Sequence, residues 1–137
     1  DIHVHFPEGA VPKDGPSAGV TVTTAMVSAL TNTPVRRDVA MTGEISLRGR
    51  VMRIGGLKEK TMAALRHGVS TVIIPEENLR DLEEIDQTVR SRLNFVTART
   101  VDTVLDTALV RQHEMGAPVL TEIPREIKKS HKPSIRQ

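Results

Sequence analysis

The feature of this sequence that most constrains its fold is an alternation of short β-branched runs with segments of helical periodicity. Strands that alternate with helices are typical of α/β domains, in which helices cover the faces of a sheet. Two of the runs are separated only by Leu47-Arg48-Gly49-Arg50, a connection short enough for a hairpin. We therefore predict an α/β fold, with a mixed sheet and flanking helices. The expected strands are 2–6, 39–45, 51–54, 71–74 and 93–97.

Three further segments show the periodicity of helices. The first, 17–32, has small and apolar residues at helical spacing and is followed by Pro34. Its β-branched residues would by propensity alone also allow a strand. The second segment is 57–67, and the third begins near Thr100 with a one-sided apolar stripe. The charged stretch after Pro75 is expected to form one or two short helices.

The composition is that of one soluble globular domain. The chain has 137 residues, of which 38% are apolar and 26% charged, and no apolar run approaches the roughly 20 residues of a membrane-spanning helix. We expect the folded domain to occupy residues 1–110. Residues 111–137 are rich in proline and polar side chains, so we expect a mobile tail there.

Charge and cysteine content exclude several functional classes. Nineteen basic and seventeen acidic residues leave a net charge of +2, which is too weak to indicate nucleic-acid binding. With Phe6 and Phe95 as the only aromatic residues, platforms for base stacking are missing. The chain has no cysteine, so it has neither disulfides nor a thiolate metal site. Together with the lack of a signal-like start, this favours a cytoplasmic or organelle-matrix setting.

Ser17 lies where a catalytic nucleophile is expected. The loop 7–16 is dense in glycine and proline, and it delivers Ser17 to the first turn of the expected helix. Backbone N–H groups at a helix start have no intrahelical partners, so they can stabilise an oxyanion formed when the hydroxyl attacks a carbonyl. Serine is also a favoured helix cap, and from position alone capping is the commoner role.

A serine nucleophile needs a base, and a lysine can act as one only in its neutral form. Burial beside few acceptors favours that form. Lys60 lies on the second expected helix, next to small residues that another backbone could approach closely. Lys58 is at least as near the apolar face, so periodicity does not choose between the two. A solvated lysine is the commoner interpretation for either one alone.

Three motifs resemble the proteolytic domain of Lon proteases. PKDGPSAG at 12–19 is similar, residue for residue, to the active-site signature of that family, and GGLKEK at 55–60 and MTGE at 41–44 match companion motifs. The resemblance implies that Ser17 is the nucleophile, that Lys60 is its catalytic partner and that Thr42 orients Lys60.

The resemblance also assigns supporting positions. Asp14, Gly15 and Pro16 would shape the active-site loop, and His3 and His5 would lie near the site with structural roles. The matching part of the chain runs from residue 1 to about 110. The implied activity is hydrolysis of peptide bonds in unfolded or damaged proteins by a serine–lysine dyad, without a metal.

What the resemblance implies about the whole protein is broader. It implies a homohexamer that receives unfolded polypeptide from an ATPase module, which would bind ATP and Mg²⁺. The phosphate-binding pattern G-x-x-x-x-G-K-[ST] is absent from this chain, so we expect no cofactor here and the nucleotide site elsewhere in the full-length protein. The expected location is the cytoplasm of a bacterium, or the mitochondrial matrix of a eukaryote. We expect neither membrane nor nucleic acid as a partner.

Two alternatives belong to other classes. Residues 15–19 satisfy G-x-S-x-G, the nucleophile elbow of α/β-hydrolases, which would make the chain an esterase. The short chain, the lack of an apolar strand directly before the loop and the few later histidines count against it. The second alternative is a non-catalytic assembly module with a degenerate site. The intact set of Ser17, Thr42 and Lys60 counts against that.

Overall fold

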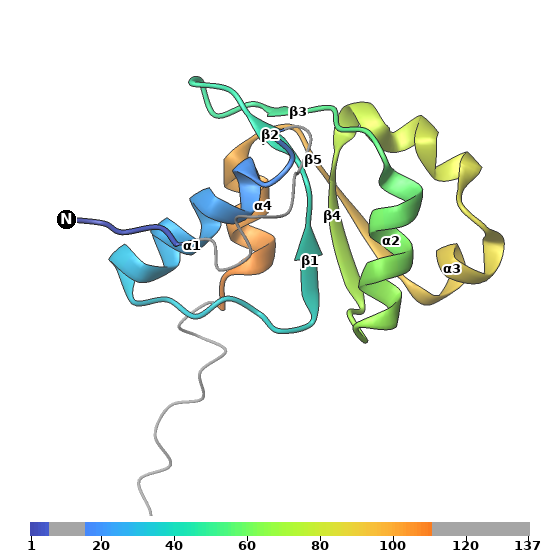
Figure 1. The fold of residues 1–137 in the computed structure, drawn as a ribbon, viewed down its shortest axis with the longest axis horizontal. Coiled ribbons are helices and arrows are strands. Elements are labelled where there is room, and N and C mark those ends of the chain that lie inside the picture. Colours follow the sequence, from blue (N-terminus) through green and yellow to red (C-terminus); the bar gives the residue numbers. More distant parts are fainter. Residues whose placement is uncertain (6–15, 111–137) are drawn as a thin grey trace, which may run out of the picture.

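The computed structural model of the chain describes residues 1–5 and 16–110. A parallel sheet of three strands lies between two layers of helices (Figure 1). Its strands are β1 (Val39–Met41), β4 (Thr71–Pro75) and β5 (Asn94–Ala98), in the order β1-β4-β5. The predicted α/β class with flanking helices is confirmed. The predicted hairpin is present, but its strands, β2 (Glu44–Ile45) and β3 (Val51–Met52), form a separate two-stranded sheet, so they do not make the parallel sheet a mixed one as expected.

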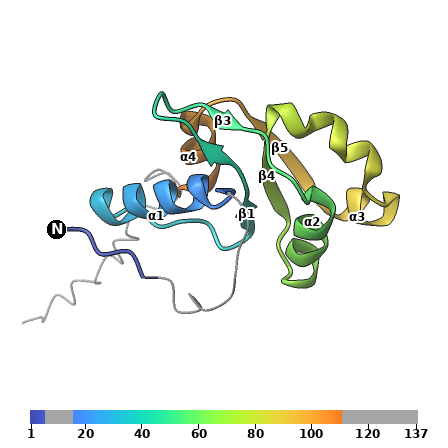
Figure 2. The same ribbon diagram turned by 45° about the horizontal axis from the view of Figure 1, so that its top comes forward.

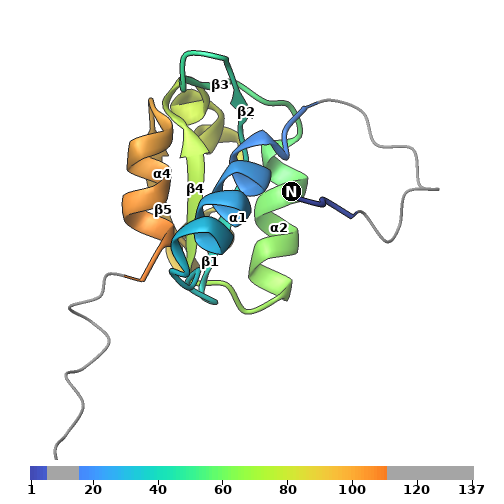
Figure 3. The same cartoon turned by 90° about the vertical axis from the view of Figure 1, so that its left-hand side faces the viewer.

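The helices divide between the two faces of the parallel sheet. Helices α1 (Gly19–Thr31) and α4 (Val101–Ala108) cover the face that Figure 3 presents to the viewer. On the other face lie α2 (Leu57–Arg66), the 3₁₀-helix η1 (Glu76–Glu84) and α3 (Gln87–Arg92) (Figure 1). The 17–32 segment is therefore a helix, and its interpretation as a strand is wrong. No helix among the described residues is long and apolar enough to cross a membrane.

The central strand β4 supplies side chains to two apolar clusters. All five of its residues are buried, because strands pair on both of its edges and helices cover both faces. Ile74 belongs to the cluster beneath α2 and α3, with Leu57, Ala64 and Val89. Ile73 points the opposite way, as successive residues of a strand do, and packs near Val20 and Val104.

The predicted strand 39–45 is divided in the structure. Its first part, β1, pairs in parallel with β4, and its second part, β2, pairs with β3. Between them, Gly43 bonds to neither sheet: its N–H donates to Ser17 O (3.0 Å), and its carbonyl accepts from Val20 N–H (3.1 Å). The strand breaks because the lead-in to α1 takes these two backbone groups. Figure 2 shows hairpin β2–β3 at the end of the sheet where α1 and α2 begin.

The predicted strand 2–6 is wrong for the residues that the structure describes. Residues 1–5 form no strand, and Ile2 and Val4 are 53% and 48% exposed. An alternating pattern becomes a strand only where a neighbouring backbone pairs with it. Phe6 lies outside the described residues.

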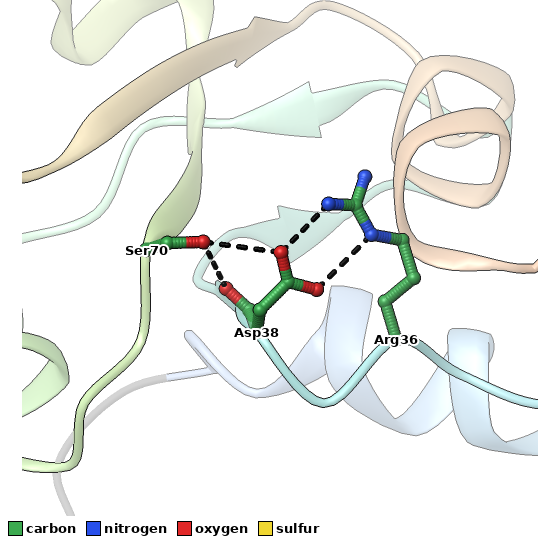
Figure 4. A network of polar contacts seen from close by, with 3 residues as sticks. All are labelled: Arg36, Asp38 and Ser70. Carbon is green, nitrogen blue, oxygen red and sulfur yellow. Dashed lines mark hydrogen bonds and ion pairs between the residues drawn. The ribbon is translucent and has the colours of Figure 1, made fainter.

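A polar cluster joins the starts of β1 and β4. Asp38 accepts two hydrogen bonds from Arg36, at 3.1 and 2.7 Å, and a third from Ser70 Oγ at 3.1 Å (Figure 4). The Arg36 guanidinium lowers the pKa of the Asp38 carboxyl, and the Ser70 hydroxyl adds to this effect. The Asp38 carbonyl also accepts from the backbone N–H groups of Ser70 and Thr71. The two strands are thus held together one residue before their ladder begins.

Candidate active site

Ser17 precedes helix α1 and does not cap it. The helix begins at Gly19, its N-cap is Ala18, and no side chain caps the first turn. The capping interpretation of Ser17 is therefore wrong. The side chain is half-buried, and the structure shows no hydrogen bond from its hydroxyl to another described residue.

The backbone of Ser17 is fixed by the link between β1 and β2. This link approaches so closely that a Cβ atom on Gly43 would lie 2.8 Å from Val51 Cγ1 and 2.9 Å from Val20 Cγ1. Both valines are buried and stiff at χ1, so neither can move away cheaply. Only glycine fits here, and its two backbone groups bond to Ser17 and Val20. Gly43 of the MTGE motif is therefore bonded to Ser17 of the PKDGPSAG motif.

The turn around Ser17 leaves few N–H groups for an oxyanion. Gly19 N–H donates to Pro16 O (3.1 Å), and Val20 N–H is taken by Gly43 O. Among the residues that the structure describes, Ser17 and Ala18 have N–H groups in this turn without such a bond. The N–H groups of the first helical turn are thus less available to an oxyanion than the sequence suggests. The N–H groups of Ser17 and Ala18, the two residues before the helix, are the better candidates.

Lys60 lies on the first turn of α2. Gly56, the N-cap, has a left-handed backbone (φ 67°), which turns the chain sharply into the helix. The Lys60 side chain is half-buried and turns back toward this cap, where Nζ donates to Gly55 O at 3.0 Å. Lys58 is exposed. The structure thus distinguishes Lys60 from Lys58 by burial and by hydrogen bonding, which helical periodicity alone could not do.

Ser17 and Lys60 line one cavity of about 360 Å³. They come from opposite layers of the domain, since α1 and α2 cover opposite faces of the sheet (Figure 1). The cavity lies where these helices begin, at the carboxyl end of β1, the edge at which ligands bind in open α/β sheets. Its other lining residues are Pro16, Glu44, Arg53, Ile54, Gly55 and Gly56.

Thr42 carries a buried hydroxyl with no partner among the described residues. The residue is 5% exposed and directly precedes Gly43, the glycine that binds Ser17. A buried hydroxyl without a hydrogen bond costs about 1–3 kcal/mol. Such a group in a native fold needs an explanation, and one explanation is a partner that reaches it in another state.

Of the other predicted site residues, Pro16 lines the cavity together with Ser17. Asp14 and Gly15 fall outside the described residues. His3 and His5 are exposed and stack on each other, with ring centroids 6.5 Å apart, and neither lines the cavity. Lys58 lines a second, adjoining hollow of about 610 Å³. In residues 1–5 and 16–110, no group of three histidine or acidic side chains is placed to hold a metal ion.

Sequence reasoning missed Arg53, Ile54 and Asn78. Arg53 and Ile54 line both hollows, and Asn78 bonds to Ile54 from η1. Each has an ordinary context in the sequence: the arginine and the isoleucine end the expected strand 51–54, and the asparagine lies in a charged stretch. No spacing marks them, because their contacts join segments 24 residues apart.

Comparison with known protein families identifies the class. Residues 1–111 match the Lon protease (S16) C-terminal proteolytic domain. An α/β domain with this match is a serine peptidase domain. The chain belongs to the Lon protease family.

Curated relatives agree with this assignment. The chain is 62% identical over 109 residues to the Lon protease of Geobacter metallireducens, covering 80% of the chain and 13% of that protein. It is 61% identical over 111 residues to the Lon protease of Chloroflexus aggregans, covering 81% of the chain and 14% of the relative. Lon protease 1 of Myxococcus xanthus is 60% identical over 124 residues, which cover 89% of the chain and 15% of that protein. The chain thus spans only about one seventh of the length of these relatives.

Proposed function

We propose that this domain hydrolyses peptide bonds of unfolded or damaged proteins through a serine–lysine dyad, with Ser17 as nucleophile and Lys60 as general base and acid. The observation that carries the proposal is the cavity that these two side chains share, although they come from opposite layers. The half-buried Lys60 side chain can supply the base, and the Ser17 hydroxyl, which has no hydrogen bond to another described residue, can supply the nucleophile that such a mechanism needs.

The proposed reaction begins with the neutral amine. Lys60 takes the proton of Ser17 as the serine oxygen attacks the substrate carbonyl, and the N–H groups of Ser17 and Ala18 hold the oxyanion. Lys60 then protonates the leaving amine. The same lysine, neutral again, takes a proton from a water molecule whose oxygen attacks the acyl carbon. The ester bond to Ser17 then breaks, and Lys60 returns the proton to the Ser17 oxygen.

In this proposal Thr42 orients the amine. Lys60 Nζ donates to Gly55 O in the present conformation, and within residues 1–5 and 16–110 the buried Thr42 hydroxyl has no partner. Rotation of the flexible lysine side chain toward Ser17 would give that hydroxyl a hydrogen bond. The orphaned hydroxyl supports this role, because the catalytic conformation would remove its desolvation cost.

Peptide cleavage tests the proposed dyad. Ser17→Ala and Lys60→Gln are each expected to abolish turnover. Lys58→Gln is the matched control, two residues away on the same helix, and should retain activity near that of the unaltered chain.

An active-site serine reagent should label the unaltered chain but not Ser17→Ala. Turnover that survives Lys60→Gln and is lost on replacing a histidine would contradict the dyad and support an esterase-type triad. Failure to label would support a non-catalytic module.

We further propose that the longer protein couples this domain to an ATPase. The relatives are Lon proteases of about seven times the matched length, and an ATPase module that binds ATP and Mg²⁺ would occupy part of the remainder. Family resemblance also supports a homohexamer and a cytoplasmic or mitochondrial-matrix location. Degradation of a folded substrate by the full-length protein, with and without ATP, tests the coupling.

A further inference from the structure

Asn78 is a fully buried amide in a helix rich in charged residues. It is 0% exposed, whereas its neighbours on η1 include Glu76, Glu77 and Arg80. Its Oδ1 accepts from Ile54 N–H at 3.0 Å, and its Nδ2 donates to Ile54 O at 2.9 Å. The carboxamide thus pairs with both backbone groups of Ile54, as a residue of a neighbouring strand would.

Asp81 completes the contact one turn further along η1. Its Oδ2 accepts from Asn78 Nδ2 at 2.5 Å, and its Oδ1 accepts from Arg53 Nη2 at 2.8 Å. Because a carboxylate only accepts hydrogen bonds, this contact fixes which side of the Asn78 amide carries the nitrogen. Two side chains of η1 therefore hold two consecutive residues, Arg53 and Ile54.

The segment held in this way forms the wall of the active-site cavity. Arg53, Ile54, Gly55 and Gly56 line both the 360 Å³ cavity and the adjoining 610 Å³ hollow. The carbonyl of Gly55, the residue after Ile54, accepts the hydrogen bond from Lys60 Nζ. A shift of Ile54 would therefore move the group to which the amine is bonded.

We propose that Asn78, supported by Asp81, is a positioning residue for the peptidase site: it sets the place of Gly55 and so the place from which Lys60 turns toward Ser17. The inference rests on the proposed function, in which Lys60 is the base. A purely structural asparagine would satisfy its own hydrogen bonds and contribute only to stability. The position of its partner, next to the residue that binds Lys60, favours the positioning role.

The test compares acylation rates of Ser17 by a small serine-directed reagent, corrected for the folded fraction. Asn78→Ala is expected to slow acylation by about 10- to 100-fold, the range expected when a reacting group is displaced by up to about 1 Å. It should also shift the pH at which the rate is half-maximal and accelerate hydrogen exchange of the Ile54 amide. Val104→Ala, equally buried on α4 against the opposite face, is the control of comparable stability and should keep the original rate and pH profile.

If Asn78→Ala does not fold, Asp81→Ala tests the positioning role instead. Asp81 keeps 20% of its side chain exposed, and its loss leaves the contacts between Asn78 and Ile54 in place. Several-fold slower acylation with a shifted pH profile is the expected result. Unchanged rates and profiles in the variants that fold would overturn the inference. Lys60→Gln, measured beside them, distinguishes failure of the positioning role from failure of the dyad. If Lys60→Gln acylates at the original rate, Lys60 is not the base and the proposed dyad itself is wrong.

Discussion

At the scale of single residues, Gly56 controls how α2 presents Lys60. Its φ of 67° is costly for any residue with a side chain, and an added Cβ would lie 3.5 Å from Lys60 Nζ. Gly56→Ala is therefore expected to lower the free energy of unfolding by roughly 1–2 kcal/mol. It should also slow Ser17 acylation, because the new methyl group would be in van der Waals contact with Lys60 Nζ and would restrict how that side chain turns. Chemical denaturation and reagent labelling check the two effects.

Gly68→Ala is the matched control for this substitution. Gly68 has a similar φ of 72°, but a Cβ there would meet nothing within 4 Å. We expect a similar loss of stability with an unchanged acylation rate. Equal slowing in both variants would show that backbone strain, and not the methyl contact with Lys60, lowers the acylation rate.

The two lysines illustrate what sequence reasoning reaches at this scale. Helical spacing placed Lys58 and Lys60 on the same element, but it could not show which of the two shares a cavity with Ser17. The distinction depends on the left-handed Gly56, which precedes the first residue of the helix, and on Ser17, which is distant in the sequence but lines the same cavity as Lys60. Motif resemblance selected Lys60 because a motif carries such three-dimensional information implicitly.

At the scale of elements, the Arg36–Asp38–Ser70 cluster should make the pairing of β1 with β4 depend on pH. The Arg36 guanidinium lowers the pKa of Asp38 in the folded state below its usual value of 3.8. The cluster therefore stabilises the fold above about pH 4, and this contribution is lost as the pH falls through the lower, folded-state pKa.

Asp38→Asn is expected to reduce the melting temperature at pH 7, with a difference from the unaltered chain that shrinks below pH 4. The reason is that the unaltered carboxyl itself becomes neutral there. Far-UV circular dichroism is the suitable measurement, because the chain has no tryptophan or tyrosine. Asp106→Asn, an exposed carboxyl on α4 for which the structure shows no hydrogen bond or ion pair with a described residue, should show no such convergence.

Element boundaries were predictable where local pattern decides them. The helices at 19–31, 57–66 and 101–108 and the strands at 71–75 and 94–98 lie within two residues of their predicted starts. The segment 39–45 was not predictable in detail, because its division depends on Gly43 bonding to residues more than 20 positions earlier. Local pattern also could not show that residues 2–5 would have no strand beside them.

At the scale of the whole molecule, β4 couples the two helical layers. Ile73 and Ile74 are adjacent in sequence and almost completely buried, yet they belong to different apolar clusters. Ile73→Val and Ile74→Val are each expected to cost about 0.5–1.5 kcal/mol. Because one strand supports both layers, we expect a single unfolding transition in each variant.

Hydrogen exchange measured on α1 and α2 tests this coupling. Either substitution should accelerate exchange in the most protected amides of both helices by a similar factor. A variant in which only the nearer helix exchanges faster would mean that the two layers unfold separately.

Because Ser17 and Lys60 come from opposite layers, the cavity that they share exists only when both layers are packed on the sheet. A chain that is still being synthesised, or one whose layers have come apart, has both side chains but not the cavity that joins them. On the proposed mechanism, such a copy cannot cut its neighbours. The peptidase activity would therefore appear only once the domain has folded.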